Sequence, residues 1–215
     1  MGFDVTFHPV SESQLQRYLA DVLADHSVAE QRAAELAPDP KERDVILKLY
    51  NAMPNWVKER IPIANSFAMG AAIIAGFLHP YWYARGTAFT FLAEERLPEM
   101  VDVFVPLGKV IPALGGLPDR SRGMIRGNES ASGLIPADGI KKASELLESL
   151  GQRRGRGGLS LLETVVDEEG LSSLRAVLEY CSANNLGMIE ASDVVVPISS
   201  QCLTKYSNLR ESGLL

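Results

Sequence analysis

The chain has 215 residues, of which 46% are hydrophobic and 22% are charged, and its formal net charge is −6. This is an ordinary globular composition, and the chain is long enough to bury a substantial core. Nucleic-acid binding usually leaves a basic footprint, so the acidic balance argues against a nucleic-acid partner.

The N-terminal segment predicts a strand followed by a helix. Apolar and polar residues alternate over residues 3–8, which is typical of a short half-buried strand, and Pro9 is expected to end it. Ser11 and Gln14 have the spacing of a capping box. Apolar residues at helical spacing follow, so we expect a helix that continues to Leu36.

Prolines punctuate the next segment. Pro38 and Pro40 break the first helix, and the apolar residues between Val45 and Tyr50 mark another. Because proline removes an amide donor and clashes with the preceding turn, we expect this helix to end before Pro54.

An uncharged segment of 24 residues, Ile61 to Ala84, comes next. A membrane span needs about 20 apolar residues, but the strictly apolar run here, Phe67–Leu78, has 12. We therefore predict a central buried helix from about Asn65 to Leu78, rich in small residues that allow close packing. A membrane-contacting helix is the alternative.

The remaining elements follow from spacing and from turn residues. Residues 81–92 are ambiguous between helix and strand, residues 101–105 look strand-like, and residues 124–134 are either a hairpin or irregular. Pro136 is a good first residue for an amphipathic helix that reaches Leu150.

The last third predicts a linker and one more helix. Residues 151–158 have the composition of a flexible linker. Leu171, Leu174 and Leu178 then recur at helical spacing, and residues 184–187 are expected to end that helix. Together the patterns predict an α+β fold, mostly α-helical with a few short strands around a central buried apolar helix. We expect a single globular domain, 1–215, with a hinge at 151–158.

The two cysteines, Cys181 and Cys202, do not form a CxxC pair, which excludes zinc-ribbon and thioredoxin-type motifs. Two cysteines do not make a disulfide framework either. The N-terminus has neither the basic nor the apolar region of a secretory signal. We therefore expect reduced, partly buried cysteines in a cytoplasmic protein.

A first candidate binding cluster lies at the end of the uncharged segment. It combines rings that carry polar tips with a cation, the kind of group enriched at binding hot spots: His79, Tyr81, Trp82, Tyr83 and Arg85. The alternative is that these rings cap the central helix and fill the core.

A second candidate cluster lies in a glycine-rich loop on the basic middle of the chain. Arginines and small polar groups in such a loop could hold a phosphate or a carboxylate: Arg120, Arg122, Arg126, Asn128, Ser130 and Ser132. No GxxxxGK[ST] or GxSxG pattern occurs, so this is neither a P-loop nor a nucleophile elbow. A solvated connecting loop is the alternative.

No pattern in the sequence specifies catalysis. His8, His26 and His79 are scattered and make no HExxH or i, i+4 pair. Arg153, Arg154 and Arg156 are a single short RGG-like run, which a flexible charged linker explains. We therefore predict no metal, no cofactor and no catalytic residues.

Two segments carry a resemblance. The turn Gly127-Asn-Glu-Ser-Ala-Ser-Gly133 before a leucine-rich helix, and the stretch from Leu174 to Val196, resemble segments of small bacterial proteins, some of them immunity proteins of toxin systems. The resemblance covers about a quarter of the chain. It implies an interaction protein and carries over no catalytic residue.

The leading hypothesis is a soluble, non-enzymatic interaction protein of immunity type that binds and neutralises a partner toxin. An acidic surface would suit a basic toxin, since such complementarity speeds association. The alternative is a small-molecule-binding protein or enzyme that uses the arginine and serine loop at 120–132. We expect a protein partner and no membrane association, and the sequence leaves the oligomeric state open.

Overall fold

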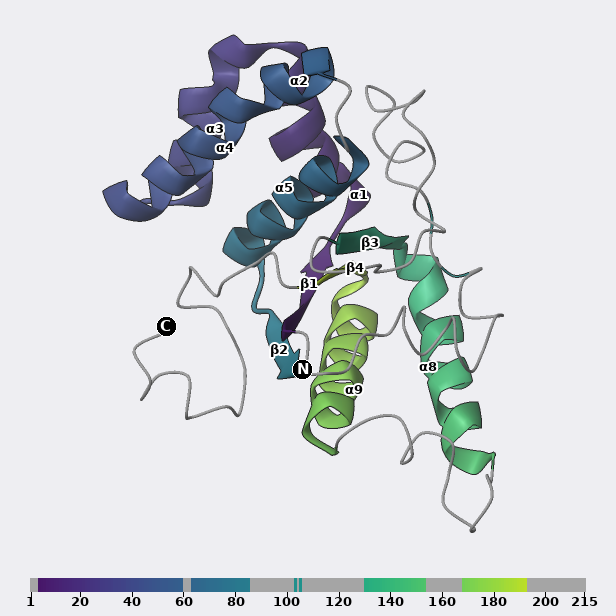
Figure 1. Cartoon of the computed structure of the whole chain (residues 1–215). Helices are drawn as coiled ribbons and strands as arrows, with labels where there is room; N and C mark the ends of the chain where they lie inside the picture. The colour runs from purple at the N-terminus through teal and green to yellow at the C-terminus, as the bar shows by residue number, and fades with distance from the viewer. Residues whose placement is uncertain are drawn as a thin grey trace.

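A computed structural model describes residues 4–59, 63–85, 103, 105, 130–153 and 168–192. These residues form an antiparallel sheet with helices on both faces (Figure 1). The strands are β1 (Asp4–Val10), β2 (Trp82–Arg85), β3 (Ser130–Ile135) and β4 (Gly187–Ser192), in the order β2-β1-β4-β3. The expected mostly helical α+β fold is confirmed.

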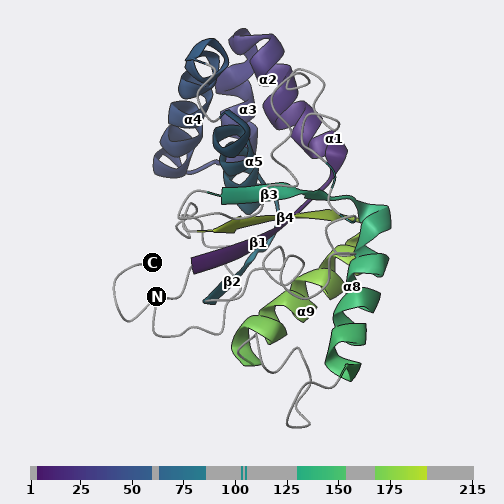
Figure 2. The same ribbon diagram turned by 45° about the vertical axis from the view of Figure 1, so that its right-hand side comes forward.

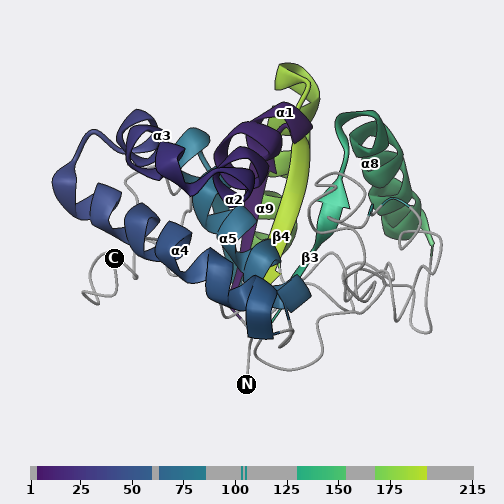
Figure 3. The ribbon, with the colours of Figure 1, turned by 90° about the horizontal axis from the view of Figure 1, so that it is seen from above.

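The helices fall into two groups on opposite sides of the sheet (Figure 2). The first group precedes β2 and comprises α1 (Glu12–Leu15), the π-helical turn η1 (Gln16–Ala20), α2 (Asp21–Ala24), the 3-10 turn η2 (His26–Val28), α3 (Ala29–Leu36), α4 (Pro40–Glu59) and α5 (Ile63–Leu78). The second group is α8 (Ala137–Gln152) and α9 (Glu168–Asn184). Seen from above, α4 lies along the outside of the first group, where it contacts α3 and α5 (Figure 3).

The alternation along β1 divides the core in two. Val5 and Phe7 pack with residues of α8 and α9, whereas Val10 packs with residues of α5 and the helices around it. Successive side chains of a strand point to opposite faces, so one short strand supplies both cores. The predicted strand is therefore confirmed, but it is buried on both faces rather than one.

Helix α5 is the predicted central helix, and it packs on the sheet. Ala71, Ala72, Ile74 and Ala75 are fully buried, and α5 contacts β1, β3 and β4. Its small residues let the helix backbone come close to the strands, which offsets the low helix propensity of its glycines.

The capping box is confirmed, but the long helix after it is interrupted. The amide of Ser11 donates to Gln14 Oε1 and the amide of Gln14 donates to Ser11 Oγ. The prediction of one helix to Leu36 is wrong, because Asp25 is extended and its carboxylate accepts the amide of Ser27. Short polar side chains compete for backbone amides in this way and start a new helix.

Two predictions that rested on proline were wrong. Pro9 lies inside β1, where it pairs with Met188 of β4 on one side. On the other side, the pairing of β1 with β2 reaches only to Phe7, which lies opposite Trp82. A proline is tolerated in a strand where no ladder bond needs its missing amide. Pro54 lies inside α4, at an exposed position where water can satisfy the carbonyl that proline leaves free.

The C-terminal half follows the prediction with small shifts. Pro136 is the N-cap of α8 rather than its first residue, and α8 continues through Gly151 and Gln152, so the predicted hinge begins in helix. Residues 154–158 lie outside the described residues. Helix α9 ends at the expected place, where Asn185 adopts a left-handed φ of 53°.

The ambiguous middle segments are partly described. Residues 82–85 form β2, Val105 makes an isolated bridge with Leu134, and residues 130–135 form β3. Residues 120–129 of the predicted glycine-rich loop lie outside the described residues. The buried Cys181 is a free thiol, as expected. Cys202 lies outside the described residues.

Candidate functional site

The structure separates the predicted aromatic cluster into two sets. Tyr81 and Tyr83 are buried, which is the core-filling alternative, whereas His79 and Trp82 are half-buried. The separation follows from the pleat, because Trp82 lies opposite Phe7 and therefore faces α9. Arg85 ends β2 opposite Asp4.

His79 and Trp82 are joined by a residue that the sequence analysis did not select. Tyr180 of α9 is half-buried, and its ring centroid lies 5.4 Å from that of Trp82 and 6.4 Å from that of His79. Both pairs are inclined rather than parallel, an arrangement that aromatic rings favour. The sequence placed Tyr180 in the last predicted helix, next to Cys181. No local pattern indicated that this helix would bring it beside residues 79–82.

His79 is held by the capping box of α1. Its Nε2 lies 2.8 Å from Gln14 Nε2 and 3.1 Å from Gln14 Oε1, and its amide donates to the carbonyl of Ala75. Partial burial lowers the pKa of His79 below its ordinary value. We call Gln14, His79, Trp82 and Tyr180 the aromatic surface, a set that unites α1, the end of α5, β2 and α9.

A second histidine lies beneath α5. His8 is fully buried in β1, its Nε2 lies 2.8 Å from Thr6 Oγ1, and its ring stacks on Tyr81 with 4.7 Å between centroids. Gly76 of α5 covers both rings, since a Cβ at this position would lie 3.4 Å from Tyr81 and 3.5 Å from His8. Burial lowers the pKa of His8 to about 3, so the ring is neutral at pH 7.

One buried acid was missed by the sequence analysis. Glu190 in β4 has no exposed surface and lies opposite Phe7, so it faces the α8 and α9 side of the sheet. Desolvation of a carboxylate is costly, so burial distinguishes Glu190 from the exposed acidic residues of the described chain. Cys181 of α9 lies on the same side, where its Sγ donates to the carbonyl of Gly187 and burial raises its pKa to about 12.

The arginine and serine loop is described only at its end. Arg120, Arg122, Arg126 and Asn128 lie outside the described residues. The backbones of Ser130 and Ser132 belong to β3, at the edge of the sheet next to β4. The anion site at 120–132 therefore stays a prediction.

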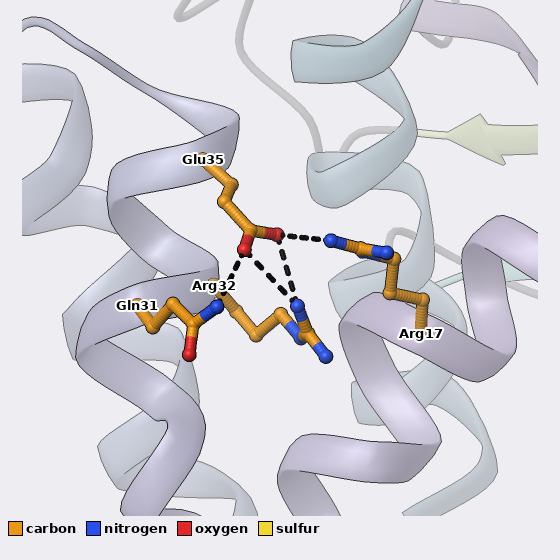
Figure 4. A network of polar contacts seen from close by, with 4 residues as sticks. All are labelled: Arg17, Gln31, Arg32 and Glu35. Carbon is orange, nitrogen blue, oxygen red and sulfur yellow. Dashed lines mark hydrogen bonds and ion pairs between the residues drawn. The ribbon is translucent and has the colours of Figure 1, made fainter.

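The helical group carries a polar network of its own (Figure 4). Glu35 of α3 accepts from Arg17 of η1 at 2.9 Å, from Arg32 at 3.0 and 3.1 Å, and from Gln31 at 2.9 Å. The hydrogen bond from Arg17 is the main reason that the pKa of Glu35 is lowered to about 2. The network links η1 to α3. The guanidinium of Arg17 also lies over the ring of Tyr18.

Two hollows open on the described surface. A groove of about 470 Å³ lies between α8 and α9, with the Arg175–Glu148 ion pair on its rim. A second hollow, of about 420 Å³, lies where β1, β3 and β4 meet the starts of α1 and α8. Neither hollow includes a residue of the aromatic surface.

Within the described ranges, His, Cys, Asp and Glu side chains do not gather in groups of three or more that could hold a metal ion. None of the helices described is both long and apolar enough to cross a membrane. Comparisons of the chain with protein-family models, with curated proteins and with solved structures found no match.

Proposed function

We propose that this chain is a non-enzymatic protein-binding module of toxin-immunity type, which uses the aromatic surface to bind and neutralise a basic partner toxin. The observation that carries the proposal is the contact of three half-buried rings, His79, Trp82 and Tyr180, from three separate elements. Tyrosine and tryptophan dominate binding hot spots because each offers a large apolar area and one polar tip.

The rings are already held in place in the free chain. Trp82 and Tyr180 pack against the core between the sheet and α9, and Gln14 fixes His79. Side chains that are ordered before binding lose less conformational entropy when a partner docks. This favours a preformed contact surface over one that must be assembled.

Charge supports a basic partner. The chain carries 27 acidic and 21 basic side chains, a net charge of −6. Opposite net charge steers two proteins together and raises the rate of association, most strongly at low salt.

The test is a pull-down with the tagged full chain and a matched pair of tyrosine variants. Tyr180→Ala removes the central ring of the aromatic surface, whereas Tyr18→Ala removes a half-buried tyrosine that lies in the helical group. We expect wild type and Tyr18→Ala to retain a basic protein in stoichiometric amount and Tyr180→Ala to lose it. The recovered protein should be toxic alone and inactive when mixed with an equimolar amount of the chain.

Two results would contradict the proposal. One is equal recovery of the partner by Tyr180→Ala and by wild type, at matched thermal stability of the two chains. The other is the absence of any stoichiometric protein partner from the host or from the products of neighbouring genes.

A further inference from the structure

The aromatic surface and the start of α1 share one hydrogen-bonding side chain. Gln14 Oε1 accepts the amide of Ser11 at 2.8 Å, which is half of the capping box. The same amide group faces the imidazole of His79, with Gln14 Nε2 at 2.8 Å and Oε1 at 3.1 Å from His79 Nε2. A change in the hydrogen bonding of His79 therefore alters the hydrogen bond between Gln14 and Ser11 at the N-cap of α1.

The protonation state of His79 decides which atom of Gln14 it needs. A neutral imidazole with a bare Nε2 accepts from the Gln14 amide nitrogen, and Oε1 remains with Ser11. A protonated imidazole carries a hydrogen on both ring nitrogens, so Nε2 becomes a donor and faces another donor at 2.8 Å. The acceptor that Gln14 offers is Oε1, 3.1 Å away, and a charged donor there would share this oxygen with the amide of Ser11.

We propose that His79 and Gln14 form a proton-sensitive link that regulates partner binding by the aromatic surface. The regulatory role rests on the function proposed above. Protonation of His79 sets a charged donor in competition with the amide of Ser11 for Gln14 Oε1, which weakens the cap of α1, and it places a positive charge on a surface that binds a basic partner. Binding is therefore tightest when His79 is neutral and weakens as the solution becomes acidic.

The surroundings of His79 favour the neutral form at pH 7. The ring of His79 contacts Gln14 from α1 and Tyr180 from α9, and of these two side chains Tyr180 is titratable. Trp82, the next ring of the surface, is neutral. Burial alone lowers the pKa of His79 from 6.5, with no carboxylate or cation of the described residues acting on it.

One substitution reverses the expected response. Gln14→Glu keeps the capping box, since glutamate and glutamine both serve at this position, and it replaces the amide nitrogen with a carboxylate oxygen. Protonated His79 would then gain an ion pair instead of losing a hydrogen bond. We expect His79 to titrate below 6.5 in the wild-type chain and above 6.5 in Gln14→Glu.

The experiment is a titration of the His79 ring signals by NMR in the full chain, with and without Gln14→Glu. The His79→Asn variant assigns the signals. In the same buffers, Gln14→Glu should gain thermal stability relative to wild type as the pH falls, and the double variant with His79→Asn should lose this gain. A common midpoint for His79 in both chains, or a wild-type midpoint above 6.5, would overturn the proposed link.

The regulatory role is then tested with the partner recovered by the wild-type chain. Its affinity is measured at about pH 7.5 and about pH 5.5, on either side of an ordinary histidine pKa. We expect acid to weaken binding by wild type several-fold more than binding by His79→Asn. Equal weakening would reject the regulation even if the titration behaves as expected, whereas full binding by Tyr180→Ala would reject the proposed function and leave the titration result intact.

Discussion

The two faces of the sheet are both buried, yet they are filled by different chemistry. On the α5 face, small helix residues bring Gly76 against the polar ring of His8 and its stacked neighbour Tyr81. On the other face, Leu147 of α8 and Leu178 of α9 belong to a core of larger apolar side chains. We expect the first face to respond to pH through His8, and the apolar core of the second face to respond to the volume of its side chains.

The largest expected effect is at Gly187, which pairs with Val10 and therefore also belongs to the first face. A Cβ at this position would collide with the carbonyl oxygen of Ile135 and lie 3.2 Å from that of Val10, and both are backbone atoms that side-chain rotation does not move. Gly187→Ala should lower the free energy of unfolding by about 3 kcal/mol or more, as overpacked sites do. Urea unfolding followed by circular dichroism measures this change.

Gly76→Ala is the matched control, at a second glycine of the same face. Its Cβ would meet side-chain atoms of Tyr81 and His8 at 3.4 to 3.5 Å, which is ordinary contact. Because alanine favours helix over glycine by about 1 kcal/mol, the substitution should be neutral or slightly stabilising. A large loss at Gly76 would show that α5 packs more tightly than these contacts indicate.

Next in size are large-to-small substitutions in the two cores. Leu19→Ala near the first face and Leu178→Ala on the second each remove a buried side chain and should cost about 2–5 kcal/mol. Both variants should still unfold in one transition, because β1 and β4 contribute to both cores. Two resolved transitions in either variant would contradict the single domain that we predict.

The change in unfolding free energy of the first face with pH is expected to be smaller, when it is counted for one pH unit. In the unfolded chain His8 is protonated below its ordinary pKa of 6.5. In the folded chain burial lowers its pKa to about 3, so the ring stays neutral to a much lower pH. Stability from neutral His8 is therefore complete above pH 6.5 and falls by up to about 1.4 kcal/mol for each pH unit below it. His8→Leu should flatten the stability curve across this range, and a curve as steep as that of wild type would assign the loss to other groups.

The smallest effect is expected in the exposed network of Figure 4. The pKa of Glu35 falls to about 2, so its ion pair with Arg17 contributes above pH 4.5 and is lost as the pH falls through the folded pKa. Arg17→Met should lower the melting temperature slightly at neutral pH and low salt. Lys48→Met, which breaks the more exposed pair with Asp44, is the control and should change it less.

Local signals in the sequence predicted much of the fold and little of the candidate site. The capping box at Ser11 and Gln14 and the apolar run of α5 are local patterns, and both were confirmed. Pro9 and Pro54 misled the prediction, because the cost of a proline depends on whether a neighbouring strand or water takes over the lost bond.

The aromatic surface depends on contacts across the chain. Tyr180 lies about a hundred residues after His79 and Trp82, and Gln14 lies 65 positions before His79. The local spacing of residues along the sequence does not predict contacts between positions so far apart. The buried Glu190 shows the same limit, because a single acid in a short strand reads as solvent-facing until the helices above it are known.

The order of the strands sets when the sheet can be completed. The central pair joins Val5 to Ser192 and Val10 to Gly187, near opposite ends of the described chain. Contacts of such sequence separation form late and slow folding, because a long loop must close before they form. During synthesis the helical group would emerge with β1 still unpaired on one side, so a nascent chain that stalls before β4 would expose the edge of β1 as a template for aggregation.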